Sequence, residues 1–275
     1  LGFCLARREA CASLLFCLIC PYPDSIHADT SHDRSLKMAV HFTGPVLYAG
    51  VNGSRRWFAD LPVGVNPDYV VQMDDFTGIA LDATNDWTVV KDSSATAALG
   101  ADAESGTLVL TSAATTDNDG ASVQGNEIYA LSASRDIWFE TKCQVTDAEG
   151  SAMDLCVGLT VNFATNPEAM LTAADRIVFQ IDDGDSNIDC VTEKNGSATT
   201  TDSGIDIATG TYVTLGFHVK GTGSVEFFVN RVKVATHTAN LPDDENLTIG
   251  AMELSGSASG TKAATFDYLL AAQTR

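Results

Sequence analysis

Histidines, short serine–glycine runs and carboxylate clusters are the residues of this 275-residue sequence that could do chemistry. The five histidines include no pair, with each other or with glutamate, at the spacing that holds a catalytic zinc ion. Gly256-Ser-Ala-Ser-Gly260 has alanine where the nucleophilic serine of a hydrolase would stand. Gly260-Thr-Lys262 leads into a predicted strand, whereas a phosphate-binding loop must open a helix. Neither nucleophilic catalysis nor nucleotide binding is therefore predicted.

Two acidic segments have the oxygen-rich composition of calcium-binding loops. They run from Asp182 to Asp189 and from Asp117 to Gly120, and Ca²⁺ takes about six to eight oxygen ligands. Both lack the glutamate that closes the helix–loop–helix calcium motif. The alternative is a pair of hairpin turns whose charges keep a sheet edge soluble. We expect turns, and we expect no metal and no other cofactor.

The net charge of −20 comes from 36 acidic and 16 basic side chains. A nucleic-acid partner requires clustered lysine and arginine, and this excess of carboxylates repels phosphates instead. The apolar run at residues 12–20 is shorter than the roughly 20 residues that span a bilayer. With 45% hydrophobic residues, the composition is that of a globular protein. We expect neither a nucleic-acid partner nor a membrane partner.

The first 37 residues differ in composition from the rest of the chain. They carry four of the seven cysteines and no net charge, whereas residues 38–275 carry all of the −20. Two interpretations stay open. One is a reading frame that begins upstream of its true start at Met38, and the other is a secretory signal with a charged start and a short apolar run. In both cases we expect residues 1–37 to lie outside the fold.

From Tyr69 onwards, apolar and polar residues alternate, which is the period of half-buried β-strands. In Asp136–Val145 the odd-numbered residues form the apolar face, and Trp138 points away from it. Asp154–Phe163 repeats the pattern and is expected to place Phe163 in the core. Further strands are expected at residues 69–76, 87–91, 107–112, 176–182, 188–194, 211–220, 224–230, 247–255 and 263–272.

Turn residues rather than helices separate these strands. Asn195-Gly196 and Asn230-Arg231 each stand between two strands at hairpin spacing. One short helix is expected after an Asn166 cap, with Pro167 at its first position, and continuing to Ala174. Many strands at about 8–12-residue spacing predict an all-β fold, an antiparallel two-sheet jelly-roll-like sandwich over residues 68–275.

Three cysteines fall inside the predicted domain. Cys143 lies on the apolar face of its strand, Cys156 on the opposite face of the next strand, and Cys190 further along the chain. Three cysteines cannot all pair, so we expect buried free thiols. Such thiols fit a protein that matures in a reducing cytoplasm.

Residues 38–67 stand between the leader and the sandwich and are rich in glycine and proline. Trp57 and Phe58 lie in this stretch. Exposed aromatic residues in an extended arm are usually docked on another surface, and buried aromatics dominate interface energies. We predict an N-terminal arm that attaches the sandwich to a partner through Trp57 and Phe58.

The later part of the chain resembles the concanavalin A-like lectin/glucanase fold. In residues 212–219, 224–235 and 241–243, a strand ending in Phe-x-Val-Asn turns into a strand that contains Val-Ala. Asp74-Asp-Phe76 followed by Trp87, and Phe266-Asp-Tyr268, look like the opening and closing strands of that sandwich. Arg231 departs from the pattern, because glycine is usual there. The resemblance implies a fold more than an activity.

The glucanase branch of this fold uses two carboxylates from a Glu-x-Asp-x-(x)-Glu motif on one strand. Alternate strand positions point to the same face, which brings the two carboxylates together. No such motif occurs here, and Glu140 and Glu226 each stand alone. We therefore expect no enzymatic activity, and a glycoside hydrolase is the least favoured of the functions.

A second resemblance is to virion structural proteins of tailed bacteriophages, of the kind seen in marine phages. It rests on Arg56-Trp-Phe58 and Leu61-Pro-Val-Gly64 in the arm, and on Trp87-Thr-Val-Val-Lys91 and residues 115–121 beyond it. It implies a capsid-associated, head-decorating role. The main prediction is a non-enzymatic virion structural protein that is made in the host cytoplasm and attached by its arm to the capsid protein lattice. Its negative charge predicts a place on the outer capsid surface, and a homo-oligomer is expected, with a trimer favoured.

The alternative prediction is a carbohydrate-binding, lectin-like module. Such a module needs exposed aromatic residues or a polar groove on its concave sheet. Trp138, which points away from the apolar face of its strand, and Tyr129 are the candidates. The competing interpretation of Trp138 is packing under a loop or against a second layer.

Overall fold

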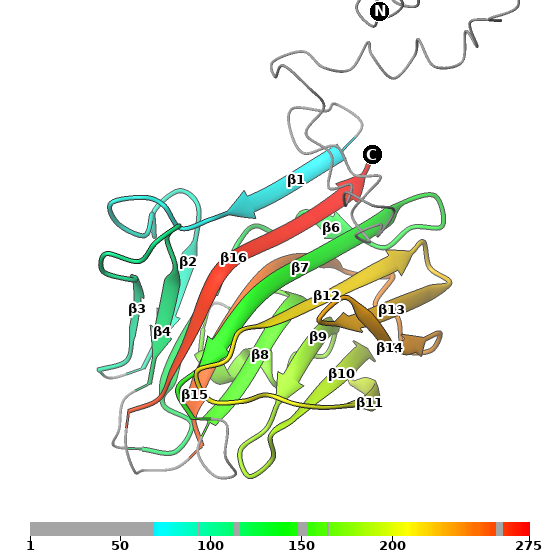
Figure 1. Cartoon of the computed structure of the whole chain (residues 1–275). Coiled ribbons are helices and arrows are strands. Elements are labelled where there is room, and N and C mark those ends of the chain that lie inside the picture. Colours follow the sequence, from blue (N-terminus) through cyan, green and yellow to red (C-terminus); the bar gives the residue numbers. More distant parts are fainter. Residues whose placement is uncertain (1–68, 93, 113–115, 148–152, 164, 257–260) are drawn as a thin grey trace, which may run out of the picture. The chain divides into compact units, whose positions relative to one another are not determined.

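Strands of alternating apolar and polar residues form two antiparallel sheets in the computed structural model, which confirms the predicted sandwich (Figure 1). The structure describes residues 69–92, 94–112, 116–147, 153–163, 165–256 and 261–275. The first sheet consists, in order, of β14 (Val232–His237), β13 (Ser224–Val229), β12 (Val213–Lys220), β7 (Asp136–Val145), β16 (Ala263–Thr274), β4 (Leu108–Thr111) and β3 (Thr96–Leu99). A further strand, β1 (Tyr69–Asp74), pairs with β16.

The second sheet has the same number of strands. Its order is β11 (Ser197–Asp206), β10 (Asn187–Lys194), β9 (Arg176–Ile181), β8 (Met153–Thr160), β15 (Asn246–Ser255), β5 (Gly120–Gln124) and β2 (Thr88–Lys91). The short β6 (Tyr129–Ala130) pairs with β15. The described residues all fall within one compact unit.

The core lies between the two sheets and is rich in phenylalanine. Phe139 of β7 stacks on Phe217 of β12 with the ring centroids 4.9 Å apart. From the opposite sheet, Phe179 meets Phe227 edge to face at 5.4 Å. These four rings are fully or almost fully buried, and burial of each stabilises the fold by about 1.5–3 kcal/mol. The predicted alternation of β7 is confirmed, because Phe139 faces this core and Trp138 faces outwards.

Four strands lie outside the predicted ranges: β3, β5, β6 and β11. β11 is a polar edge strand in which exposed and half-buried residues alternate, so it has no apolar face to detect. β5 is the opposite case, because all five of its residues are buried. Ala121 and Val123 alternate with Ser122 and Gln124, but two apolar residues are too few to indicate a strand.

The two predicted hairpins are confirmed. Asn195 and Gly196 join β10 to β11 with φ angles of 50° and 76°, and Asn230 and Arg231 join β13 to β14 with 50° and 68°. Positive φ at both central residues is the geometry of the two-residue turns that match strand twist. Glycine adopts it without steric cost, whereas Arg231 does not.

The single expected helix is shorter than predicted. It is one 3₁₀ turn, η3 (Pro167–Met170), rather than a helix that reaches Ala174. The predicted cap is confirmed, since Asn166 Oδ1 accepts a hydrogen bond of 3.0 Å from the Glu168 N–H. Met170 is fully buried and anchors this turn on the second sheet.

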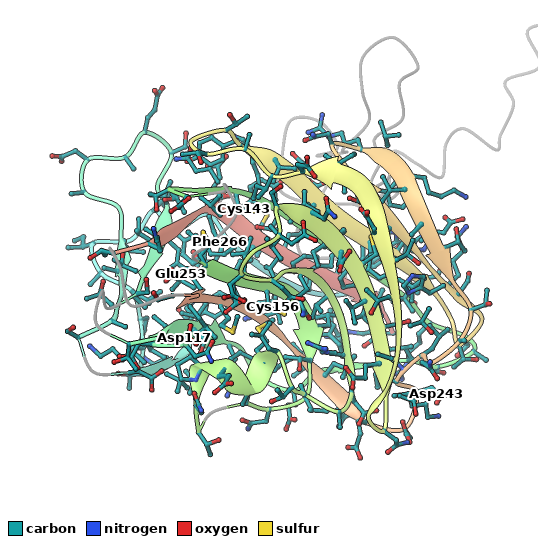
Figure 2. All side chains as sticks on the ribbon, turned by 90° about the horizontal axis from the view of Figure 1, so that it is seen from below. Asp117, Cys143, Cys156, Asp243, Glu253 and Phe266 are labelled. Carbon is teal, nitrogen blue, oxygen red and sulfur yellow. The ribbon has the colours of Figure 1, made fainter. Side chains whose placement is uncertain are left out.

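Cys143, Cys156 and Cys190 are buried free thiols, as predicted, and two of them are labelled in Figure 2. Burial raises the pKa of each thiol to about 12. The leader (1–37) and the arm (38–67), with Trp57 and Phe58, lie outside the described residues, so their roles stay predictions. In the part of the chain that is described, no helix has the length and hydropathy to cross a bilayer.

Candidate ligand-binding face of the first sheet

A row of side chains crosses the outer face of the first sheet at one level of its strands. The register pairs Glu226 with His218, His218 with Trp138, Trp138 with Ala272, and Ala272 with Val71. Directly opposed residues on antiparallel strands have Cβ atoms about 5 Å apart. These five residues therefore form a continuous row over β13, β12, β7, β16 and β1, which lie side by side in Figure 1. We call them the cross-strand row.

Trp138 is the largest side chain of the cross-strand row. Its indole stacks on the His218 imidazole with ring centroids 4.9 Å apart and an interplanar angle of 11°. Tyr69 of β1 approaches it tilted, at 6.2 Å. Leu270 and Ala272 pack beneath the indole. The imidazole covers part of Trp138, and the indole stays partly exposed.

Asp136 fixes the orientation of His218. The imidazole Nε2 lies 3.2 Å from Asp136 Oδ2, and the other carboxylate oxygen accepts a 3.2 Å hydrogen bond from the Gly221 N–H. Burial lowers the pKa of His218, and Asp136 opposes that shift. The imidazole is therefore neutral at pH 7. Because a carboxylate can only accept, geometry assigns the proton to Nε2 and leaves Nδ1 as an acceptor.

The lysines on the strands of this face are held by carboxylates. Lys220 Nζ lies 2.8 Å from one oxygen of Glu226, and Lys233 Nζ lies 3.5 Å from the other. The Lys220 hydrogen bond is the main reason that the pKa of Glu226 is lowered. Lys142 Nζ lies 2.7 Å from Asp267. The face thus has charges of both signs, and these three lysines already have carboxylate partners.

Two carboxylates share this face on β7, with Trp138 between them. Asp136 and Glu140 are four residues apart, so their Cα atoms are separated by about 13 Å along the strand. Glycosidases hold their two carboxyl groups about 5–9.5 Å apart. Glu140 is also engaged, since the Tyr268 hydroxyl donates a 2.6 Å hydrogen bond to it. The wide spacing of the two backbone positions and the hydrogen bond from Tyr268 do not favour a catalytic pair.

Tyr129, the second aromatic candidate from the sequence, is not on this face. Its side chain is 0% exposed, and its hydroxyl donates a 3.2 Å hydrogen bond to the Ala271 carbonyl. Burial raises its pKa. The prediction of Tyr129 as a ligand-stacking residue is therefore wrong, because β6 places it inside the sandwich. Tyr69 and His218 were not predicted, since only the register reveals that they flank Trp138.

The outer face of the second sheet is covered by the protein's own chain. Phe163 and Met170, from the segment between β8 and β9, pack on buried residues of that sheet: Cys156, Val178, Val191, Met252 and Leu254. We call these seven residues the closing cluster. The expectation that Phe163 belongs to the inter-sheet core is wrong. β8 ends at Thr160, and the chain then turns so that Phe163 packs on the opposite side.

A buried ion pair completes the covered face. Arg176 Nε lies 2.8 Å from Glu193, with the two side chains only 9% and 13% exposed. The Arg176 guanidinium also donates to the Met170 carbonyl at 3.2 Å and to the Gln180 amide oxygen at 2.9 Å. The donors of Arg176 thus tie η3 to the strands below it.

The acidic segment at 182–189 forms the turn between β9 and β10, residues 182–186, and the first three residues of β10. The Asp185 N–H donates to the Asp182 carbonyl at 3.1 Å, and Asp185 accepts a 3.0 Å hydrogen bond from the Asn187 N–H. These bonds are the turn chemistry that the sequence offered as the alternative to calcium. Among the described residues, no group of three or more histidine, cysteine or acidic side chains is arranged to hold a metal ion.

Residues on which the fold resemblance rests meet near β1. Asp74 accepts hydrogen bonds from the Trp87 indole at 2.8 Å and from the Phe76 N–H at 2.7 Å. The Phe76 and Trp87 rings lie 6.0 Å apart. These contacts and the two sheets together define a concanavalin A-like β-sandwich.

Within that class, residues 103–267, more than half of the chain, match the family described as SO2946-like, C-terminal domain. The chain belongs to this family. No curated protein is detectably similar to it in sequence.

Solved structures of carbohydrate-active proteins share the fold. A GH16 protein of Bacteroides ovatus, solved with a mixed linkage glucan product, is 13% identical with a TM-score of 0.53, over 72% of this chain and 98% of its own. An endo-1,3-beta-glucanase from Streptomyces sioyaensis is 12% identical with a TM-score of 0.54, over 77% and 98%. An endo-beta-1,4-glucuronan lyase from Trichoderma reesei is 13% identical with a TM-score of 0.50, over 68% and 93%. At these identities the likeness is one of fold.

Proposed function

We propose that this protein is a non-enzymatic carbohydrate-binding protein and that glycans bind at the cross-strand row. The observation that carries the proposal is Trp138 on an outer face, between Tyr69 and His218 and beside the Asp136 carboxylate. Aromatic surface flanked by a few oriented polar groups is the usual composition of a small-molecule site. The likeness to glucan-acting proteins supports the same class of ligand.

The proposal of a binding protein rather than an enzyme rests on the carboxylates. Asp136 and Glu140 are four residues apart along β7, about 13 Å between Cα atoms, and Glu140 is held by the Tyr268 hydroxyl, so they do not favour an acid–base pair. On the outer face of the second sheet, the closing cluster and the Arg176–Glu193 pair cover part of the strands, and Asp154 of β8 is only 5% exposed. A protein with this arrangement retains glycans without cleaving them.

The test is calorimetric titration of the full chain with gluco-oligosaccharides, followed by the Trp138→Ala variant. We expect binding that weakens about fivefold or more in Trp138→Ala, because a stacking aromatic contributes about 1 kcal/mol or more. Tyr212→Ala is the matched control. Tyr212 is also an aromatic residue at the first sheet, but the Lys142 ammonium lies over its ring at 4.6 Å. Equal weakening by both variants, or release of reducing sugar, would contradict the proposal.

A second candidate is the virion structural protein predicted from the sequence. It is favoured by the net charge of −20 and by the aromatic arm that precedes β1. In this proposal Trp57 and Phe58 bind the capsid lattice, and the sandwich, as a trimer, faces outwards from the virion. Both functions are compatible in one chain, since the arm and the cross-strand row are separate parts of the sequence.

Sedimentation with purified capsid shells tests this second candidate. The full chain is expected to sediment with the shells, and a Trp57→Ala/Phe58→Ala double variant is expected to stay in solution. Val232→Ala, at a residue 63% exposed on the sandwich, is the control that should still sediment. A double variant that binds as well as the wild type would exclude the arm as the attachment site.

A further inference from the structure

We infer that the cross-strand row selects uncharged glycans over glycans that carry carboxylates. This inference rests on the proposed carbohydrate binding and concerns its ligand class. The evidence is the way in which charge is distributed around Trp138. An acidic sugar needs a cation that is available to it, because burying a carboxylate without a partner is costly.

The two lysines nearest the row are already used, and Arg275, at the end of β16, donates its Nε–H to the Tyr69 carbonyl at 3.4 Å. Lys220 and Lys233 both hold Glu226, which is itself a member of the row. A uronate at Trp138 would have to displace Glu226 from Lys220. It would then leave the Glu226 carboxylate, whose side chain is only 19% exposed, without that partner. Lys220 is 46% exposed, so the loss of this pair adds a modest cost to the binding of a uronate.

Asp136 adds direct repulsion at the other side of Trp138. Its side chain is 41% exposed. Burial lowers the pKa of His218, which favours the neutral imidazole, and Lys220, which lies opposite Asp136 in the register, holds Glu226 instead. Two like charges a few ångströms apart near a protein surface repel strongly enough to change affinity about tenfold or more. A sugar hydroxyl meets no such penalty. It can donate to Asp136 and to the free His218 Nδ1.

The experiment compares two oligosaccharides of equal length on the full chain. The probes are a mixed-linkage β-glucan tetrasaccharide, which is neutral, and a β-1,4-glucuronan tetrasaccharide, which carries one carboxylate per sugar. In 50 mM salt we expect the neutral probe to bind at least tenfold more tightly. Raising the salt to 0.5 M screens the repulsion, so the difference should narrow without any change to the protein.

Asp136→Asn makes the same test by mutation. The amide oxygen can still accept from the Gly221 N–H, so the turn is kept, and the glucuronan should gain affinity relative to the glucan. Asp202→Asn is the control. It removes the same charge from the edge strand β11 of the second sheet and should leave the ratio unchanged.

The possible failures are distinguishable. Glucuronan that binds as tightly as the glucan at low salt, with Trp138→Ala abolishing both, would overturn the inference and leave carbohydrate binding intact. Binding of neither probe would overturn the proposed function and the inference together. An identical shift in the ratio for Asp136→Asn and Asp202→Asn would also overturn the inference, since the effect would then come from net charge and not from this face.

Discussion

The outer faces of the two sheets are built from similar strands, but the second is covered by the chain and the first stays partly exposed. The second sheet is covered by Phe163 and Met170, and its Arg176–Glu193 pair is almost entirely buried. The first sheet keeps Trp138, Asp136 and its lysine pairs partly exposed. In a sandwich of this kind, the connecting segments rather than the strands therefore determine which outer face is open to a ligand.

In this protein, the segment between β8 and β9 covers the outer face of the second sheet. Asn166 caps η3, and η3 brings Met170 down onto the sheet. Gly250 of β15 provides the space, because a Cβ on that residue would lie 2.8 Å from the Phe163 ring. The Asn166 cap, the η3 turn and Gly250 are local features. Together they allow a second small core to form on the outer face of this sheet.

The largest expected effect concerns the strand that contributes to both the closing cluster and the core. On β15, Met252 and Leu254 face outwards into the closing cluster. Glu253 between them, labelled in Figure 2, faces inwards and is 0% exposed. Burial raises the pKa of Glu253 to about 9. The folded state therefore retains a proton that the unfolded chain releases above pH 4.5 or so.

Because the folded state retains this proton, the protein is expected to lose stability as the pH rises. The free energy of unfolding should fall between pH 5 and pH 9 by several kcal/mol, at about 1.4 kcal/mol for each unit of pKa shift. Glu253→Gln should remove most of that slope. Urea denaturation at several pH values measures it. An unchanged pH profile in Glu253→Gln would show that the buried carboxyl is not the source.

Phe163→Ala is expected to have the next largest effect. It opens the closing cluster and should cost about 3–4 kcal/mol, as for other buried phenylalanines. Val71→Ala is the matched change on the first sheet. Val71 is 36% exposed in the cross-strand row, so its truncation should cost under about 1 kcal/mol. Equal costs would mean that the two faces do not differ in the way described.

Breaking an ion pair should likewise cost more stability on the second sheet than on the first. Arg176→Ala leaves a buried Glu193 without its partner and should cost about 3 kcal/mol. Lys142→Ala breaks a pair whose side chains are 40% and 22% exposed, and such pairs contribute about 0–1 kcal/mol. Both are measured by thermal and urea unfolding. A larger loss for Lys142→Ala would contradict the comparison.

The smallest expected effect compares one hairpin from each sheet. Arg231 adopts φ = 68° where Gly196 adopts 76° in the equivalent turn. Arg231→Gly should stabilise the first-sheet hairpin by about 1 kcal/mol, because the left-handed conformation costs a non-glycine residue about that amount. Gly196→Arg should destabilise the second-sheet hairpin by a similar amount. A loss of stability in Arg231→Gly would show that its side chain contributes more than the strain removes.

Much of the fold follows from the period of apolar residues and from turn chemistry. β7, both Asn-initiated hairpins and the Asn166 cap are all visible in the sequence, because each depends on neighbours within a few positions. β11 and β5 were not predicted from the sequence, for different reasons: β11 is a mainly polar edge strand, and β5 is short with all five of its residues buried.

The candidate site is less predictable, since it depends on register. Trp138 is identified by its position opposite the apolar face of one strand. That His218 and Tyr69 flank it requires the pairing of β12, β7, β16 and β1. The burial of Tyr129 and the outward turn of Phe163 are tertiary facts that no local pattern contains.

The central claim is that one face of this sandwich binds a neutral glycan and the other is closed. A ¹⁵N-resolved NMR titration of the full chain with the mixed-linkage β-glucan tetrasaccharide tests it most directly. The account predicts shifts at the Trp138 indole N–H and at backbone amides of β1, β7 and β12, with β8, β9 and β15 unchanged. Shifts concentrated on β8, β9 and β15, or no shifts at millimolar sugar, would contradict it.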